Sequence, residues 1–227
     1  MMISDWVLVI TSLFLGATAL FVPVLAEFLK RKVFAPKLEI QFELSTPFCV
    51  RTFWRSSDDP NLNEPVYFFR FQVVNNGQSQ ARLCEAVLEE LWIYDVSGNP
   101  TKFPRFSPIN LRIEGGTPFL NINPHRRVYC PIGHISSPSY QEKAERGAAI
   151  DIPGRHGDEL RFFLELTQFP FSQPNCLVPG KYAIKISLYS ENATRCEIYF
   201  QINWSGKWQD TEPEMFRELV IQRANRI

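Results

Sequence analysis

Residues 66–77 read Val-Tyr-Phe-Phe-Arg-Phe-Gln-Val-Val-Asn-Asn-Gly, and this stretch decides the fold class. Its first nine residues are apolar on nearly both faces of an extended chain, which predicts a central β-strand. The Asn-Asn-Gly end tolerates the positive φ angles of a turn, so we expect a hairpin there. Residues 81–94 fit helical spacing as well as strand alternation, and the turn signals on both sides favour a strand.

Alternation of apolar and polar residues continues on both sides of this stretch. Residues 37–44 alternate strictly, as a half-buried strand does. No stretch has the pattern of a crossover helix, so the sequence predicts a mainly β fold, an antiparallel two-layer sandwich. Residues 137–157 interrupt the pattern with a short helical turn around 141–146, and we expect a binding or regulatory surface there. The other expected strands cover residues 109–113, 119–122, 127–132, 160–166, 181–189 and 195–204.

The N-terminal part contains an uncharged run of 21 residues, 6–26, followed by the bases Lys30, Arg31 and Lys32. As a helix the run is about 31 Å long, close to a hydrocarbon core of about 30 Å. It is longer than the apolar part of a signal peptide and has no base before it. We therefore predict a retained transmembrane helix that contacts the lipid bilayer of the cell (inner) membrane. The positive-inside rule places the rest of the chain in the cytoplasm.

Small residues recur on one face of this predicted helix at Ser12, Gly16 and Ala19. Close packing of small residues is a principal means of association between helices in a membrane. The pattern is compatible with a homo-oligomer formed through this face. It is equally compatible with the general abundance of small residues in membrane helices.

The C-terminal residues 210–227 predict an amphipathic helix. Thr211 and Glu214 have capping-box spacing, and Pro213 is in the first turn. The chain therefore divides into an anchor over residues 1–32, a sandwich over 33–209 and a C-terminal helix over 210–227. The expected apolar face of that helix consists of Phe216, Leu219, Val220, Ala224 and Ile227.

Charge and cysteine content narrow the possible partners. Of the 24 basic and 24 acidic residues, three bases and two acids precede residue 33, which leaves the remainder with a formal net charge of −1. Nucleic acid is therefore not an expected partner. The five cysteines form no C-x-x-C pair, which favours free and mostly buried thiols, as in a reducing compartment.

Two stretches resemble a known family. Residues 66–83 run from an apolar strand through Val-Val-Asn-Asn-Gly-Gln-Ser-Gln-Ala into a second strand, and residues 179–186 read Pro-Gly-Lys-Tyr-Ala-Ile-Lys-Ile. Both are similar to prokaryotic immunoglobulin-like domains of the CARDB and alpha-galactosidase-associated type. The resemblance covers about a fifth of the chain, and it implies an immunoglobulin-like fold and a binding or spacer role. The organisation as a whole is also similar to uncharacterised single-pass prokaryotic membrane proteins.

Residues able to carry chemistry are few. His125, Cys130 and His134 have spacings that a metal site could use, but they lack a fourth ligand, so we predict no metal and no cofactor. His156 and Asp158, with Glu159, could form an acid/base cluster or belong to a solvated loop. The sequence contains no nucleophile elbow, phosphate loop or dinucleotide fingerprint.

Trp204 and Trp208 flank a short polar segment. They could form an exposed aromatic platform or cover the end of the core. Together with His156 and Asp158 they are the candidate ligand-binding residues.

Two functions from different classes fit these features. The favoured hypothesis is a single-pass membrane-anchored interaction or sensory module whose cytoplasmic immunoglobulin-like domain binds a protein or a small ligand. The alternative is a membrane-tethered hydrolase, metal-dependent or acid/base, that uses the loop 151–159.

Overall fold

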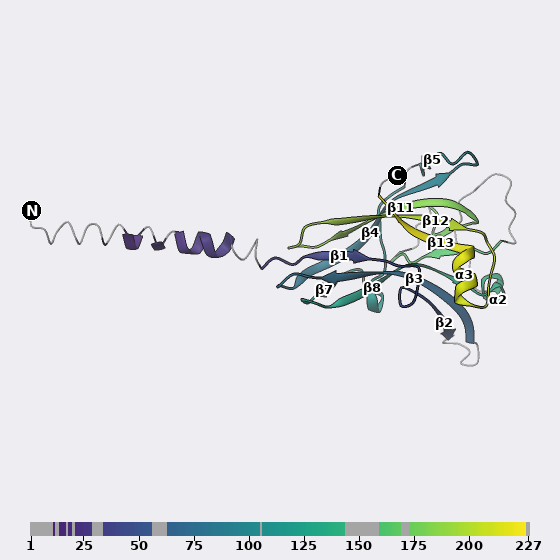
Figure 1. The fold of residues 1–227 in the computed structure, drawn as a ribbon, viewed down its shortest axis with the longest axis horizontal. Helices are drawn as coiled ribbons and strands as arrows, with labels where there is room; N and C mark the ends of the chain where they lie inside the picture. Colours follow the sequence, from purple (N-terminus) through teal and green to yellow (C-terminus); the bar gives the residue numbers. More distant parts are fainter. Residues whose placement is uncertain are drawn as a thin grey trace, which may run out of the picture.

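The computed structural model describes residues 11, 14–16, 18–19, 21–28, 34–55, 63–104, 106–143, 159–168 and 173–225. Within these residues two antiparallel sheets lie one above the other as a β-sandwich (Figure 1). The first sheet contains, in spatial order, β1 (Leu38–Gln41), β3 (Asn63–Asn75), β8 (Arg127–Ser136), β9 (Phe162–Leu164) and β10 (Cys176–Leu177), with β2 (Cys49–Arg55) also paired to β3.

The second sheet begins at the C-terminal strand. Its order is β13 (Leu219–Ala224), β12 (Cys196–Trp204), β11 (Gly180–Tyr189), β4 (Ala81–Tyr94) and β5 (Pro100–Lys102), with β6 (Ile109–Asn110) and β7 (Leu120–Ile122) also paired to β4. Three short helices complete the described part of the domain: η1 (Glu114–Gly116), α2 (Pro138–Lys143) and α3 (Glu212–Glu218).

The core lies between the two sheets and is rich in aromatic side chains. Strand β3 turns Tyr67, Phe69, Phe71 and Val73 inward, and all four side chains are fully buried. The ring of Phe71 contacts that of Phe200 on the opposite sheet, with 6.4 Å between centroids. Burial of large rings from both layers is the principal force that holds a sandwich together.

The antiparallel two-layer sandwich predicted from the sequence is confirmed. Residues 81–94, which also fitted a helix, form β4 over that full range, and residues 66–74 lie within β3. The strands β2, β5, β10 and β13 were not predicted. Strands β5 and β10 have three and two residues, and alternation is a weak signal over so short a stretch. Strands β2 and β13 are longer, and each pairs with a single neighbour in its sheet.

The hairpin expected at residues 75–77 is wrong, because β3 and β4 belong to different sheets. Asn75 forms the corner between the layers. Its buried Nδ2 donates to the backbone oxygens of Ser79 (2.8 Å) and Ile122 (2.9 Å), and its Oδ1 accepts the amides of Lys37 (3.2 Å) and Gly77 (3.0 Å). These bonds replace the ladder that a hairpin would have formed.

Gly77 is required at this corner by close backbone approach. A Cβ at this position would lie 2.4 Å from the oxygen of Ala35 and 2.6 Å from Cα of Pro36. No side chain fits there without moving the backbone of the segment that leads into β1.

The C-terminal helix expected over residues 210–227 is wrong in its second half. Helix α3 ends at Glu218, and β13 then pairs with β12 from Leu219↔Trp204 to Ala224↔Tyr199. Leu219 and Ile221 are buried, so the segment also has the two-residue period of a strand. The free edge of β12 can bond every second backbone group of this segment, which outweighs a weak helical preference.

Thr211 does precede α3, as the capping-box pattern predicted, but its hydroxyl donates to the Glu214 carboxylate (2.6 Å) and caps no backbone amide. The neighbouring Glu212 carboxylate instead accepts the Arg51 amide (2.8 Å) and the Thr46 hydroxyl (3.1 Å). These bonds attach α3 to the first sheet.

The transmembrane helix predicted over residues 6–26 is also wrong. Among the described residues, no helix is both long and apolar enough to cross a membrane. Gly16 and Ala19 are exposed helical residues, and Ser12 lies outside the described range.

The free, mostly buried cysteines predicted from the sequence are confirmed: all five are free, four are buried, and Cys196 is partly buried. Burial raises the pKa of Cys196 to about 11 and that of Cys49 to about 12, because the thiolate is poorly solvated there. Burial also raises the pKa of Cys130 and of Cys84. These thiols are structural side chains of the sandwich.

We expect the raised pKa of Cys196 to slow its alkylation by iodoacetamide at pH 8 by about 100-fold relative to an ordinary thiol, because the thiolate reacts. Mass spectrometry of the folded chain over time measures this rate. The same chain in guanidinium chloride is the control, in which all five cysteines should react rapidly. Fast labelling of Cys196 in the folded chain would contradict the assignment.

Replacement of Asn75 by Ala should lower the free energy of unfolding by about 3 kcal/mol, because buried backbone groups of several segments lose their partners. Chemical denaturation of the full chain measures the loss. Asn76→Ala is the matched control: its exposed side chain bonds Glu39 (2.7 Å), and its removal should cost about 0.5 kcal/mol. Equal losses for the two variants would show that Asn75 is not the corner that joins the sheets.

Candidate ligand-binding pocket on the second sheet

A pocket of about 330 Å³ lies on the outer face of the second sheet, over strands β4, β11, β12 and β13. Side chains on this face come from the positions that alternate with the core residues. One row across the sheet places Gln222 opposite Gln201, Gln201 opposite Ala183, and Ala183 opposite Trp92. The only small side chain in this row is Ala183, which is completely buried beneath its neighbours.

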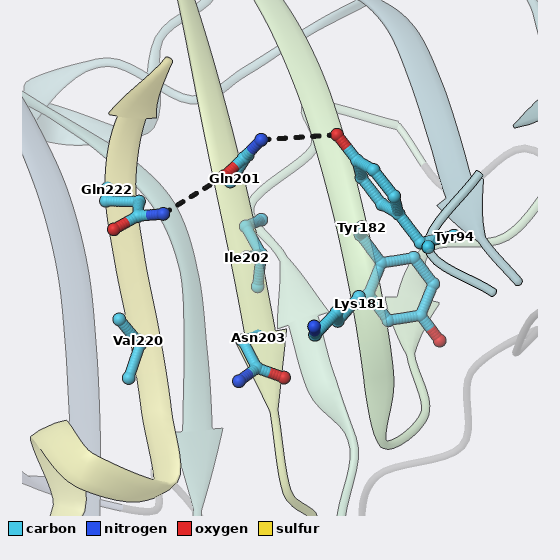
Figure 2. A pocket seen from close by; sticks show the side chains of 9 residues that line it. Tyr94, Lys181, Tyr182, Gln201, Ile202, Asn203, Val220 and Gln222 are labelled. Atoms are coloured by element: carbon cyan, nitrogen blue, oxygen red, sulfur yellow. Dashed lines mark hydrogen bonds between the residues drawn. The ribbon is translucent and has the colours of Figure 1, made fainter. Parts of the chain in front are cut away.

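A chain of hydrogen bonds organises the pocket. Nε2 of Gln222 donates to Oε1 of Gln201 (3.0 Å), and Nε2 of Gln201 donates to the hydroxyl oxygen of Tyr94 (3.3 Å). Figure 2 shows the Tyr94 ring lying across β11 with its hydroxyl toward Gln201, and Gln222 reaching Gln201 from the other side. These two bonds orient the three side chains relative to one another in the absence of a ligand.

Several polar groups of the pocket have no partner within the described part of the chain. They include the Oε1 atom of Gln222 and the side-chain amide of Asn203, which lies opposite Lys181 on the neighbouring strand. The described residues place no carboxylate within 4.0 Å of Lys181. The pocket thus offers amide donors, amide acceptors, a phenol and one ammonium group on a sheet surface.

The rim of the pocket is a hydrogen-bonded turn at residues 95–99. Asp95 accepts the backbone amides of Ser97 (2.9 Å) and Asn99 (2.8 Å), and the bond from Asn99 is the main cause that lowers the pKa of Asp95. Gly98 has a φ of +82°, a conformation that favours glycine. The turn holds Gly98 at the edge of the pocket.

Next to the pocket on the same face lies a cluster of charges that compensate one another. Lys185 contacts Glu89 (3.7 Å) and Glu197 (3.2 Å), while Arg195 contacts the same two carboxylates at 2.9 Å and 2.6 Å. Tyr189 donates its hydroxyl to Glu89. The charges of this cluster are paired with one another, whereas the exposed side chains of Lys181, Asn203 and Gln222 in the pocket are open to solvent.

Charges and hydrogen bonds in this cluster shift the pKa values of Glu89 and Lys185. Burial alone would raise the pKa of Glu89, but the bond from Tyr189 and the charges of Arg195 and Lys185 outweigh it and lower the pKa. Burial alone would lower the pKa of Lys185, and Glu197 reverses that and raises it. Both shifts favour the charged forms.

The residues predicted from the sequence do not form this pocket. Trp204 is buried in the core, where its Nε1 donates to the Leu160 oxygen (2.9 Å). Trp208 packs on Tyr67 at 5.1 Å between centroids, so the pair covers the end of the core. His156 and Asp158 lie outside the described residues.

The potential metal ligands do not converge either. His125 is exposed in a turn, Cys130 faces the core, and His134 lies on the outer face of the first sheet with Nδ1 2.6 Å from Oε1 of Glu165. Among the described residues, no group of three potential ligands is close enough to hold a metal ion.

Sequence reasoning did not identify Tyr94, Gln201 or Gln222. A signal existed for the first two, because they occupy outward positions of predicted strands. Gln222 could not be placed beside Gln201, because its segment was expected to be helical.

Comparisons with known proteins add no assignment. No family model matches the chain, and no curated protein matches it. The function is therefore argued from the pocket itself.

We expect Glu89→Gln to destabilise the chain by about 1 kcal/mol at pH 7 and by much less in acid. Because the folded pKa of Glu89 is lowered, its contribution is complete above the unfolded value near 4.5 and disappears as the pH falls through the folded value. Urea unfolding of wild type and variant at pH 7 and at pH 3 measures the loss of stability at each pH. A loss that is the same at the two pH values would mean that the ionised carboxylate contributes nothing.

Proposed function

We propose that this chain is a non-catalytic binding module whose pocket on the second sheet takes a small neutral ligand rich in hydroxyl groups, such as a carbohydrate. The hydrogen-bonded chain Gln222–Gln201–Tyr94 is the observation that carries the proposal. It presents ordered polar groups in a cavity of about 330 Å³, within the size range of small-molecule sites.

The chemistry of the side chains supports this ligand class. A sugar hydroxyl both donates and accepts, and so do amides, which present an NH₂ and a carbonyl side by side. A strongly anionic ligand would find only Lys181 in the pocket. The Trp92 and Tyr199 rings, 6.3 Å apart on the same outer face, add apolar surface on which the C–H face of a sugar ring can lie.

The fold is consistent with the binding role. We propose an immunoglobulin-like domain of the CARDB and alpha-galactosidase-associated type, supported by the two antiparallel sheets and by the Asn-Asn-Gly and Pro-Gly segments. Members of that family mostly serve as binding or spacer modules.

The hydrolase hypothesis gains no supporting observation. Of its acid/base candidates only Glu159 is described, and it is exposed. In the described part of the chain, the pocket contains neither a carboxylate nor an imidazole.

A Gln201→Leu substitution should weaken carbohydrate binding at least about tenfold, because it removes the central amide and leaves Gln222 and Tyr94 without their shared partner. The full chain is screened against neutral oligosaccharides of glucose, galactose, mannose and N-acetylglucosamine. Any sugar that binds is then titrated by calorimetry with wild type and variant.

Gln41→Leu is the matched control, because Gln41 lies on β1 of the other sheet and its side chain bonds only Glu39 in the described part of the chain. This variant should bind as wild type does. If no sugar of the panel binds, or if Gln201→Leu binds as tightly as wild type, the proposed function is wrong.

A further inference from the structure

A second, chemically different cavity lies on the outer face of the first sheet, on the opposite side of the sandwich from the pocket. This groove has a volume of about 450 Å³ and is bounded by β2, β3, β8 and residues 112–116. Its walls are mostly apolar and include Val50, Phe68, Ile113 and Pro131. Two arginines, Arg70 and Arg112, also line it.

The guanidinium of Arg70 is held in place without a counter-charge. Its Nη2 donates to the Pro47 oxygen (2.5 Å), and its central carbon lies 4.6 Å from the centroid of the Tyr129 ring. The described residues place no carboxylate within 4.0 Å of it, and its buried Nε has no acceptor among them. A fixed, uncompensated cation of this kind needs little ordering when an anion binds.

Other charges around the groove do not neutralise Arg70. Arg112 is 3.5 Å from Oε2 of Glu165, whose other oxygen bonds His134, so that carboxylate is already shared. Glu114, at the rim, is 3.6 Å from Arg126. The positive charge of Arg70 in the groove is therefore not neutralised by these carboxylates.

We propose that this groove binds a carboxylic acid that has an apolar body. An arginine fork matches the two oxygens of a carboxylate, whereas the apolar walls favour a hydrocarbon portion over a second charge. The cavity is in the size range of sites for small organic ligands. This site is independent of the pocket on the second sheet and of the function proposed for it.

The test titrates the full chain with hexanoate and follows binding by calorimetry and by the NMR signals of Phe68 and Tyr129. We expect saturable binding of hexanoate, with hexanol at least about tenfold weaker because it has the same tail without the charge. Arg70→Met keeps much of the aliphatic part of the side chain but removes the guanidinium, so it should also weaken hexanoate binding at least about tenfold. Circular dichroism confirms that the variant is folded.

Arg223→Met is the matched control, because Arg223 is an exposed arginine on β13 of the other sheet, and it should bind hexanoate as wild type does. If Arg70→Met does not fold, Arg70→Lys replaces it. This variant keeps the positive charge but lacks the two-pronged guanidinium, so it should bind hexanoate at least about threefold more weakly than wild type. Inorganic phosphate should compete poorly. Absent hexanoate binding, equal binding by the folded Arg70 variant, or phosphate binding as tight as that of hexanoate would each overturn the proposal.

Discussion

The buried side chain of Asn75 is the interaction on which the arrangement of the two sheets depends. It has no access to water, so its amide group must be satisfied by the protein, and the four partners belong to segments near residues 37, 77, 79 and 122. All of them meet only when the chain leaves the first sheet and enters the second at this point. A hairpin at the same residues would have kept both strands in one layer and left these backbone groups unpaired.

This corner also decides which way the two cavities face. Strand β3 belongs to one layer and β4 to the other, so the outward side chains of the two strands point in opposite directions. Arg70 on β3 therefore lines a groove on one side of the sandwich, and Tyr94 on β4 lines the pocket on the other. Two cavities of different chemistry arise from successive strands because the chain changes layers between them.

The two cavities differ from the surface beside the pocket in how far their charged and polar groups are paired. Around Lys185 and Arg195, each cation has carboxylate partners, so this cluster stabilises its own geometry and offers little to a ligand. The amides near Gln201 and the guanidinium of Arg70 keep unmet hydrogen-bonding or electrostatic capacity. Polar groups that are ordered but not satisfied lower the cost of binding, since their orientation is already fixed.

The sequence by itself determined the sandwich and most of its strands, but not β2, β5, β10 and β13. Strict alternation over residues 37–44 and the near-continuous apolar run at 66–74 indicate half-buried or buried strands, because apolar side chains two residues apart face the same side. Residues 81–94 also fit helical spacing, and the turn signals on both sides favour the strand. The tertiary structure alone decided three further features: the sheet change at Asn75, the strand at residues 219–224 and the meeting of Tyr94, Gln201 and Gln222. Each depends on partners distant in the chain, and local spacing carries no information about which segment will pair with which edge.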